Sequence, residues 1–245
     1  MDIDFNNIET LFLDAGNTLV AMDLEWFSRE LEQFDLRYTA EELRRAEASA
    51  RPLVSSAIKR LKSTENESTS VFYIQSILNS LPGAPQIEEG KMSKIVEYML
   101  TVISADGQTQ RVWNNILPGV REALRKFKGN GLQLCVVSNS DGTVKKILES
   151  LDLGSFFNEI FDSHIIGYEK PDPRIFNHAM EACGAEPETT LHVGDLFHVD
   201  VMGAWAADIK AVLLDPFGDW EGYECPRFPD LLTLAEAVTG PEQRS

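Results

Sequence analysis

The sequence has little positive charge, few cysteines and no long apolar segment. Lysine and arginine number 22 against 39 aspartate and glutamate residues, which gives a formal net charge of −17. A surface this acidic repels the phosphates of nucleic acids and of anionic lipids, so we expect neither nucleic acid nor a membrane as a partner. An enzyme for anionic substrates would have to concentrate positive charge locally, through a metal or a placed lysine.

The three cysteines, Cys135, Cys183 and Cys225, match no zinc-binding spacing, and their odd number argues against a disulfide framework. Cys135 lies in an apolar run, which is typical of a core residue. The N-terminal segment is acidic where a signal peptide would be basic, and no apolar run approaches the length of a membrane span. We therefore expect a cytoplasmic protein. The sequence carries no signal of an oligomeric state.

What the chain does contain is an alternation of apolar runs and helical patterns. Continuous apolar runs predict parallel strands that are buried on both faces. Strands are expected at 10–14, 132–138, 190–194 and 209–214, with another short one within 160–166. Helices are expected at 119–128, 141–151, 173–183 and 199–207. This alternation predicts an α/β fold with a doubly wound, Rossmann-like parallel sheet.

One long segment, residues 22–112, breaks the alternation. It has helical patterns with no convincing strand between them, at 24–34, 40–62, 70–81 and 87–103. We therefore expect two domains: a Rossmann-like core formed by residues 1–21 and 113–245, and an inserted all-helical module formed by residues 22–112.

Polar residues follow several of the expected strands, at the sheet edge where open α/β proteins bind ligands. Asp14 ends the first strand, where a buried charge needs a partner, so it is a candidate nucleophile or metal ligand. Asp195 and Asp200 follow the strand at 190–194, where one could bind Mg²⁺ and the other could orient a metal-bound water or the neighbouring backbone. Capping of the next turn or helix is the simpler alternative for each carboxylate, above all for Asp200.

Two further motifs could handle phosphate. Ser138 and Asn139 end a strand, where a hydroxyl and backbone N–H groups can hold phosphate oxygens, although such residues are also common in turns. Lys170 lies in a loop fixed by Pro171 and Pro173. It could neutralise phosphoryl charge, whereas an ordinary surface lysine is the alternative.

Taken in this order, the motifs resemble the haloacid dehalogenase-like superfamily over the whole chain. The helical insertion after the first strand resembles the cap domain of one of its subfamilies. The resemblance is carried by Asp14-x-x-x-Thr18, the strand ending in Ser138, Lys170-Pro171-x-Pro173 and Gly194-Asp195-x-x-x-x-Asp200.

The resemblance implies a Mg²⁺-dependent phosphatase for a small phosphorylated metabolite. Asp14 would attack phosphorus to form an aspartyl-phosphate, which water then hydrolyses, while Lys170 balances the negative charge. The substrate phosphate would be bound by Ser138, Asn139 and Thr18. The metal would be held by Asp14, the backbone carbonyl of Gly16 and Asp195. Asp200 would lie next to these ligands without binding the metal itself.

Gly16 is a departure from this family, whose phosphatases carry an Asp two residues after the nucleophile as general acid and base. Such catalysis is typically worth about 10²–10⁴-fold. Glu169 or His198 could supply another acid, or the substrate could have a good leaving group, such as an acyl phosphate. A slow phosphatase, or a relative that binds phosphate without turnover, is also compatible with Gly16.

Two kinds of relative also lack that Asp. The 2-haloacid dehalogenases displace halide from carbon without a metal, but they lack the motif in which this chain retains Asp195. Phosphonoacetaldehyde hydrolases keep Mg²⁺ and use a cap lysine as a Schiff base, for which Lys59 and Lys62 are candidates. Substrate specificity would come from cap side chains, and the aromatic residues there could line a cavity or form a core: Trp26, Phe27 and Phe72.

Overall fold

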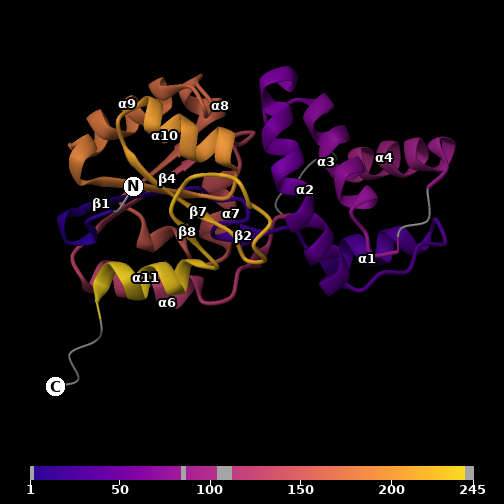
Figure 1. Ribbon diagram of the computed structural model, residues 1–245, viewed down its shortest axis with the longest axis horizontal. Helices are drawn as coiled ribbons and strands as arrows, with labels where there is room; N and C mark the ends of the chain where they lie inside the picture. Colours follow the sequence, from indigo (N-terminus) through magenta and orange to yellow (C-terminus); the bar gives the residue numbers. More distant parts are fainter. Residues whose placement is uncertain (1–2, 84–86, 104–111, 241–245) are drawn as a thin grey trace. The chain divides into compact units, whose positions relative to one another are not determined.

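The computed structural model describes residues 3–83, 87–103 and 112–240. The chain forms two compact units. The core unit comprises Met1–Ala21 and Ile116–Ser245, and the helical unit comprises Met22–Asn115 (Figure 1).

The core unit is built on a six-stranded parallel sheet, so the predicted α/β fold is confirmed. The strand order is β5-β4-β1-β6-β7-β8. The chain thus winds outward from β1 in both directions, which is the doubly wound arrangement. The strands are β1 (Thr10–Leu13), β4 (Gln133–Ser138), β5 (Glu159–Asp162), β6 (Thr190–Gly194), β7 (Lys210–Leu214) and β8 (Arg227–Phe228).

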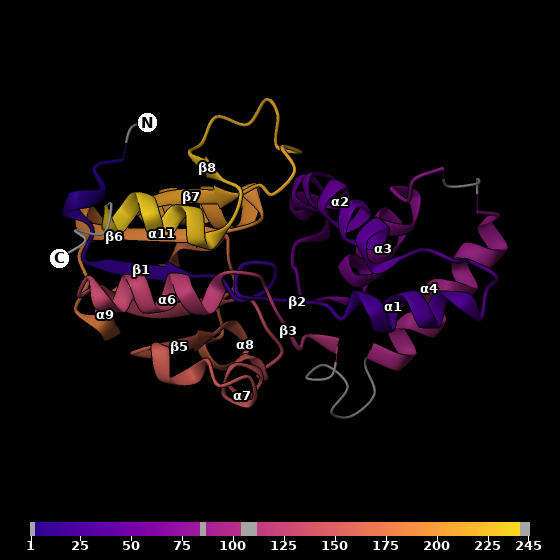
Figure 2. The ribbon, with the colours of Figure 1, turned by 90° about the horizontal axis from the view of Figure 1, so that it is seen from below.

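Helices cover both faces of this sheet (Figures 1 and 2). Helices α9 and α10 lie on one face, where Phe12 of β1 and Val137 of β4 pack against Phe176 of α9. Helices α6 and α11 lie on the other face (Figure 2). Every residue of β1 and β6 is buried, as expected for central strands covered on both sides. The core helices are α6 (Val120–Gly129), α7 (Val144–Ser150), α8 (Ser163–Ile166), α9 (Pro173–Cys183), α10 (Met202–Ala206) and α11 (Leu231–Thr239).

Two expected elements differ in kind from the prediction. The expected helix over 199–207 begins as a π-helical turn at Phe197–Val201, and only then continues as α10. The apolar run within 160–166 changes from strand to helix after Asp162, whose side chain caps α8 by accepting a hydrogen bond from the His164 N–H. A period of two and a period of 3.6 cannot be told apart in so short a run.

The helical unit contains α1 (Leu24–Glu32), α2 (Ala40–Leu61), α3 (Glu67–Asn79) and α4 (Glu89–Ile103). Side chains cap the first three of these helices: Asp23, Thr39 and Asn66 each accept a hydrogen bond from a backbone N–H in the first turn. A two-stranded sheet of β2 (Val20–Ala21) and β3 (Asn115–Ile116) pairs the segments by which the chain leaves and re-enters the core unit.

The helical unit has its own apolar core, which includes the fully buried Phe27. Trp26 is partly buried and packs against this core, and Phe72 lies under the guanidinium of Arg60, 5.6 Å from the ring centre. Two of the three aromatic residues considered as cavity-lining therefore serve packing, and the third is engaged by a cation. None of the helices in the described ranges has the length and apolar character that a membrane crossing requires.

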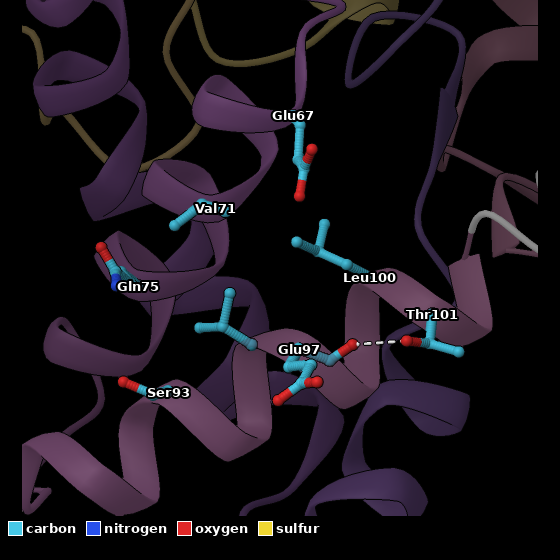
Figure 3. Close-up of a pocket in the computed structure, with 8 residues that line it drawn as sticks. Glu67, Val71, Gln75, Ser93, Glu97, Leu100 and Thr101 are labelled. Carbon is cyan, nitrogen blue, oxygen red and sulfur yellow. Dashed lines mark hydrogen bonds between the residues drawn. The ribbon is translucent and has the colours of Figure 1, made fainter.

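A groove of about 340 Å³ runs between α3 and α4 of the helical unit (Figure 3). Glu67, Val71 and Gln75 line it from α3 at intervals of four residues, so they share one helix face. The residues that line it from α4 are Ser93, Val96, Glu97, Leu100 and Thr101. The groove therefore belongs to the helical unit alone.

Candidate active site

Two carboxylates lie at neighbouring strand ends in the core unit. Parallel pairing places Leu13 of β1 beside Val193 of β6, and the Asp14 N–H donates to the Val193 carbonyl at 2.9 Å. Asp14 and Asp195 are the residues that continue these two strands, and both are buried, with 7% and 4% of their surface exposed. The sheet thus brings together two acidic residues that are far apart in sequence.

Lys170 reaches this cluster from a loop before α9. Its ammonium donates to Oδ1 of Asp14 at 2.7 Å and to Oδ1 of Asp200 at 2.6 Å. The side chain is almost completely buried, so water weakens these contacts little. The surface-lysine alternative is therefore excluded.

Asp200 accepts hydrogen bonds through both of its carboxylate oxygens. Its Oδ2 accepts from the backbone N–H groups of Asp195 and Leu196, at 3.1 and 2.8 Å. Its Oδ1 accepts from Lys170 and faces Nε2 of His192 at 3.1 Å. Asp200 thus fixes the backbone at Asp195 and the ammonium of Lys170 at the same time.

Gly194 makes this arrangement possible. A Cβ atom at residue 194 would lie 2.2 Å from Cγ of Asp200, so no larger residue leaves room for that carboxylate. The π-helical turn at Phe197–Val201 carries Asp200 back under the end of β6. Such turns are rare and frequently occur at functional sites.

The loop that carries Lys170 is held by Asn139. The Asn139 side chain accepts from the Lys170 N–H at 2.7 Å and donates to the Lys170 carbonyl at 2.9 Å. The Lys170–Pro171 peptide bond is cis. Helix α10 approaches the same loop closely at Gly203, where a Cβ atom would lie 2.9 Å from Cα of Pro171.

The loop after β1 forms a tight turn. The N–H groups of Thr18, Leu19 and Val20 all point to the carbonyl of Ala15, at 3.4, 2.9 and 3.0 Å. Thr18 is fully buried, and its Oγ1 has no hydrogen-bond partner within the described part of the chain. Ser138, at the end of β4, is also buried, and its hydroxyl donates to the Asn139 carbonyl at 3.2 Å.

The charges of the cluster perturb one another. Burial raises the pKa of Asp14, although the nearby Lys170 acts in the opposite direction. Burial alone would lower the pKa of Lys170, but the carboxylates of Asp14 and Asp200 outweigh it and raise that pKa. Burial also disfavours charge on Asp200, but Lys170 and the His192 hydrogen bond more than offset it, so the pKa of Asp200 is lowered. The ammonium and the Asp200 carboxylate are therefore both charged near pH 7.

Comparison with known proteins places this site in a family. The sequence pattern of the haloacid dehalogenase-like hydrolases matches residues 8–208. The chain belongs to the haloacid dehalogenase-like hydrolase family.

Two curated relatives illustrate the match. The Bos taurus haloacid dehalogenase-like hydrolase domain-containing protein 3 is 36% identical over 109 residues, which are 44% of this chain and 43% of that protein. A glyceraldehyde 3-phosphate phosphatase from Methanothermobacter thermautotrophicus is 36% identical over 100 residues, 40% of this chain and 44% of that protein. The chain thus spans less than half the length of these two relatives.

A solved structure shares the fold over nearly the whole chain. It is of YfnB from Bacillus subtilis, which is described as a haloacid dehalogenase-like hydrolase bound to magnesium. It superposes with a TM-score of 0.63 at 19% sequence identity and covers 96% of this chain and 99% of YfnB.

The donor set of this hydrolase suits a hard divalent cation. No group of three or more His, Cys, Asp or Glu side chains within the described ranges has the arrangement of a complete protein-only metal site. Mg²⁺ does not need one, because it typically uses one or two carboxylates together with backbone oxygens, waters and substrate phosphate. Asp14 and Asp200, both buried, contact the ammonium of Lys170, and the buried Asp195 continues the strand next to that of Asp14. Buried carboxylates thus outnumber the ammonium here, and this excess of negative charge favours a cation.

Sequence reasoning missed His192. This residue lies within β6 and is fully buried, with its ring against Phe176 at 4.9 Å between ring centres. Burial lowers its pKa, so the ring is neutral and Nε2–H donates to the Asp200 carboxylate. A histidine inside an apolar strand was the available signal, since a buried imidazole needs a polar partner.

Other candidates from the sequence lie in different surroundings. His198 packs its ring against Phe197 and Tyr223, with centres at 5.3 and 5.9 Å, and Glu169 is partly exposed in the loop before Lys170. Lys62 ends α2 and is exposed, while the side chain of Lys59 lies outside the described part of the chain. The rings that His198 contacts, Phe197 and Tyr223, are not members of the Asp14 cluster.

Proposed function

We propose that this hydrolase is a Mg²⁺-dependent phosphatase that acts on a small phosphorylated metabolite through an aspartyl-phosphate on Asp14. The supporting observation is the buried Asp14 carboxylate, held by Lys170 at 2.7 Å and continuing the strand next to that of Asp195. A relative that is 36% identical over 100 residues is named as a phosphatase for glyceraldehyde 3-phosphate, which is a small phosphorylated metabolite.

The proposed roles follow from these contacts. Lys170 occupies Oδ1 of Asp14, so we assign the attack on phosphorus to Oδ2. The ammonium favours the ionised form of the Asp14 carboxylate, against the effect of burial, and offsets charge on the phosphoryl oxygens. Asp200 is a positioning residue, since it holds both Lys170 and the backbone at Asp195.

Bound Mg²⁺ would supply charge stabilisation and alignment of the phosphoryl group. Asp14, Asp195 and the backbone carbonyl of Gly16 are the proposed ligands. The proposed phosphate-binding groups are the hydroxyls of Ser138 and Thr18 and the backbone of Asn139. The Thr18 hydroxyl fits because it is buried with no partner among the residues that the structure describes, and a ligand can satisfy such a group. The Asn139 side chain is already committed to the Lys170 backbone, so only its main chain enters the proposal.

Gly16 sets the expected substrate class. A glycine offers no acid to protonate a leaving group, so we propose substrates whose leaving group is stable as an anion, such as acyl or aryl phosphates. The helical unit is the proposed cap, formed by residues 22–112 in the sequence-based division. We further propose that its side chains select the substrate. Cytoplasmic location and the exclusion of nucleic-acid partners stay predictions.

The test is hydrolysis of 4-nitrophenyl phosphate with Mg²⁺ and with EDTA. Activity should require Mg²⁺ and disappear in Asp14→Asn. Asp162→Asn is the matched control, because Asp162 is also a buried carboxylate at a strand end of the same sheet but lies outside the Lys170 cluster. Full activity of Asp14→Asn, or equal loss in both variants, would refute the assignment of the nucleophile.

Gly16 also motivates a second candidate function, halide displacement from a 2-haloacid. In that chemistry Asp14 would attack carbon, and no metal would be needed. Halide release from a 2-haloacid in EDTA, together with no phosphatase activity in Mg²⁺, would favour it. A Schiff-base mechanism has less support, because Lys62 is exposed.

A further inference from the structure

Two of the three cysteines lie in contact in the core unit. Cys135 is in the middle of β4 and is fully buried, and Cys183 is the last residue of α9 and is partly exposed. Their sulfur atoms are 3.1 Å apart, although 48 residues separate them in sequence. A disulfide bond has a sulfur–sulfur distance of about 2.0 Å, so small side-chain rotations would join them.

The two thiols of this pair differ in exposure and in acidity. The hydrogen-bonding contact with Cys135 lowers the pKa of the Cys183 thiol, whereas the same contact and burial raise the pKa of Cys135. Cys183 is thus both the accessible and the more acidic member. Cys225 provides a contrast within the chain, since burial raises the pKa of its thiol to about 11.

We propose that Cys135 and Cys183 are a redox modification site, at which a hydroperoxide converts the thiol pair into a reversible disulfide. The Cys183 thiolate attacks one peroxide oxygen, the O–O bond breaks, and a sulfenic acid forms as the other oxygen leaves as water. The Cys135 sulfur then attacks the sulfur of Cys183, the S–O bond breaks, and its oxygen leaves as a second water. Two thiols lose two electrons and two protons, and hydrogen peroxide gains both.

The bond would tie β4 to α9, two elements that lead to the candidate active site. β4 ends at Ser138, next to Asn139, and α9 follows the Lys170 loop that the Asn139 side chain holds. A cross-link between positions 48 residues apart restricts the unfolded chain. Oxidation should therefore raise the melting temperature, by roughly 5–10 °C.

Peptide mapping tests the link directly. Trypsin places the cysteines on three separate peptides, at residues 129–145, 175–210 and 211–227. The full chain would be treated with hydrogen peroxide, alkylated under denaturing conditions and digested. We expect peptides 129–145 and 175–210 to be joined, with the link lost after dithiothreitol and Cys225 still alkylated. Over-oxidation of Cys183 while Cys135 stays alkylatable, or a link to Cys225, would overturn the proposal.

Melting temperatures provide the second arm of the test. The peroxide-induced rise should be absent in Cys183→Ser and preserved in Cys225→Ser, which serves as the matched control. A similar rise in Cys183→Ser would show that another modification causes it, and would overturn the proposal. Neither arm measures hydrolysis, so the outcome is independent of the phosphatase assignment.

Discussion

The core unit and the helical unit both bury an ion pair, but they assemble it from different distances along the chain. In the helical unit, Arg51 donates to Glu47 one turn earlier on α2, at 2.5 Å, and both side chains are buried. In the core unit, Lys170 reaches Asp14, 156 residues away, and Asp200, 30 residues away. One pair forms within a helix, whereas the other requires the whole sheet to be in place.

Because of this difference, we expect one ion pair to serve stability and the other to serve catalysis. A pair one turn apart stabilises its own helix and its packing, as the hydrogen bond from Tyr73 of α3 to Glu47 shows. A cluster that holds two carboxylates against one ammonium at the edge of a sheet carries charge that packing alone would not require. The contacts of Lys170 with Asp14 and Asp200, here called the core pair, should therefore be essential for activity. The Arg51–Glu47 ion pair, here called the helical pair, should be replaceable by apolar side chains.

The largest expected effect is that of Lys170→Met. It removes the ammonium and leaves Asp14 and Asp200 buried without their shared cation. The free energy of unfolding should fall by about 3–5 kcal/mol, and hydrolysis should fall by at least about 10²-fold. Urea denaturation and the aryl phosphate assay measure the two losses, and Lys62→Met is the control because Lys62 is exposed. Wild-type activity in Lys170→Met would show that the core cluster is no more catalytic than the helical pair.

Gly16→Asp should produce the next largest change, in the opposite direction. A carboxylic acid two residues after Asp14 would restore a proton donor, so kcat for an alkyl phosphate should rise by about 10²–10⁴-fold. The rate with 4-nitrophenyl phosphate should change little, because that leaving group needs no proton. Gly16→Asn is the control that adds bulk without an acid. Equal gains for both substrates would contradict the view that Gly16 limits only protonation.

Replacing one glycine in each unit by alanine, Gly194 in the core unit and Gly90 in the helical unit, should change stability differently. The Cβ of Gly194→Ala would lie 2.2 Å from Cγ of Asp200, so the core must shift and stability should fall by about 1–3 kcal/mol. Gly90 of α4 has nothing within 4 Å of an added Cβ, so Gly90→Ala should be neutral or stabilise by up to about 1 kcal/mol. Thermal unfolding of both variants measures the contrast. Equal stability of the two would mean that the contact between residue 194 and Asp200 does not constrain the core.

The smallest effect is expected where both members of the helical pair are replaced together. Arg51→Met alone leaves Glu47 buried and should cost about 3–5 kcal/mol, whereas Glu47→Leu with Arg51→Met should lie within about 1–2 kcal/mol of wild type. A double-mutant cycle by urea denaturation would give the coupling energy. If the double variant is as unstable as the single one, the helical pair is not the replaceable element that the comparison requires.

Much of the core was predictable because its elements have strong local signals. Strand β6 (Thr190–Gly194) and helix α9 (Pro173–Cys183) have the predicted bounds. A continuous apolar run identifies the first, and a proline start with a glycine stop identifies the second. Strand β8 and helix α11 were not predicted, since β8 has only two residues and depends on β7 for its pairing.

The candidate site was predictable in its acidic residues and Lys170, but not in its contacts. The roles of Asn139 and His192 depend on which loops and strands become neighbours. The Asn139 side chain forms two hydrogen bonds with the backbone of Lys170, 31 residues away. His192 contacts Asp200 because the π-helical turn brings Asp200 under the end of β6. Local pattern cannot specify a turn that rare, so these supporting contacts required the structure.

Binding of Mn²⁺, a spectroscopic substitute for Mg²⁺, tests the central claim most directly. Electron paramagnetic resonance of free Mn²⁺ during titration gives the number of bound ions and their affinity without any substrate. We expect one site per chain in the wild type and in Asp162→Asn, and binding weakened at least about tenfold in Asp195→Asn. Unchanged binding in Asp195→Asn, or equal loss in Asp162→Asn, would contradict a cation held between the ends of β1 and β6.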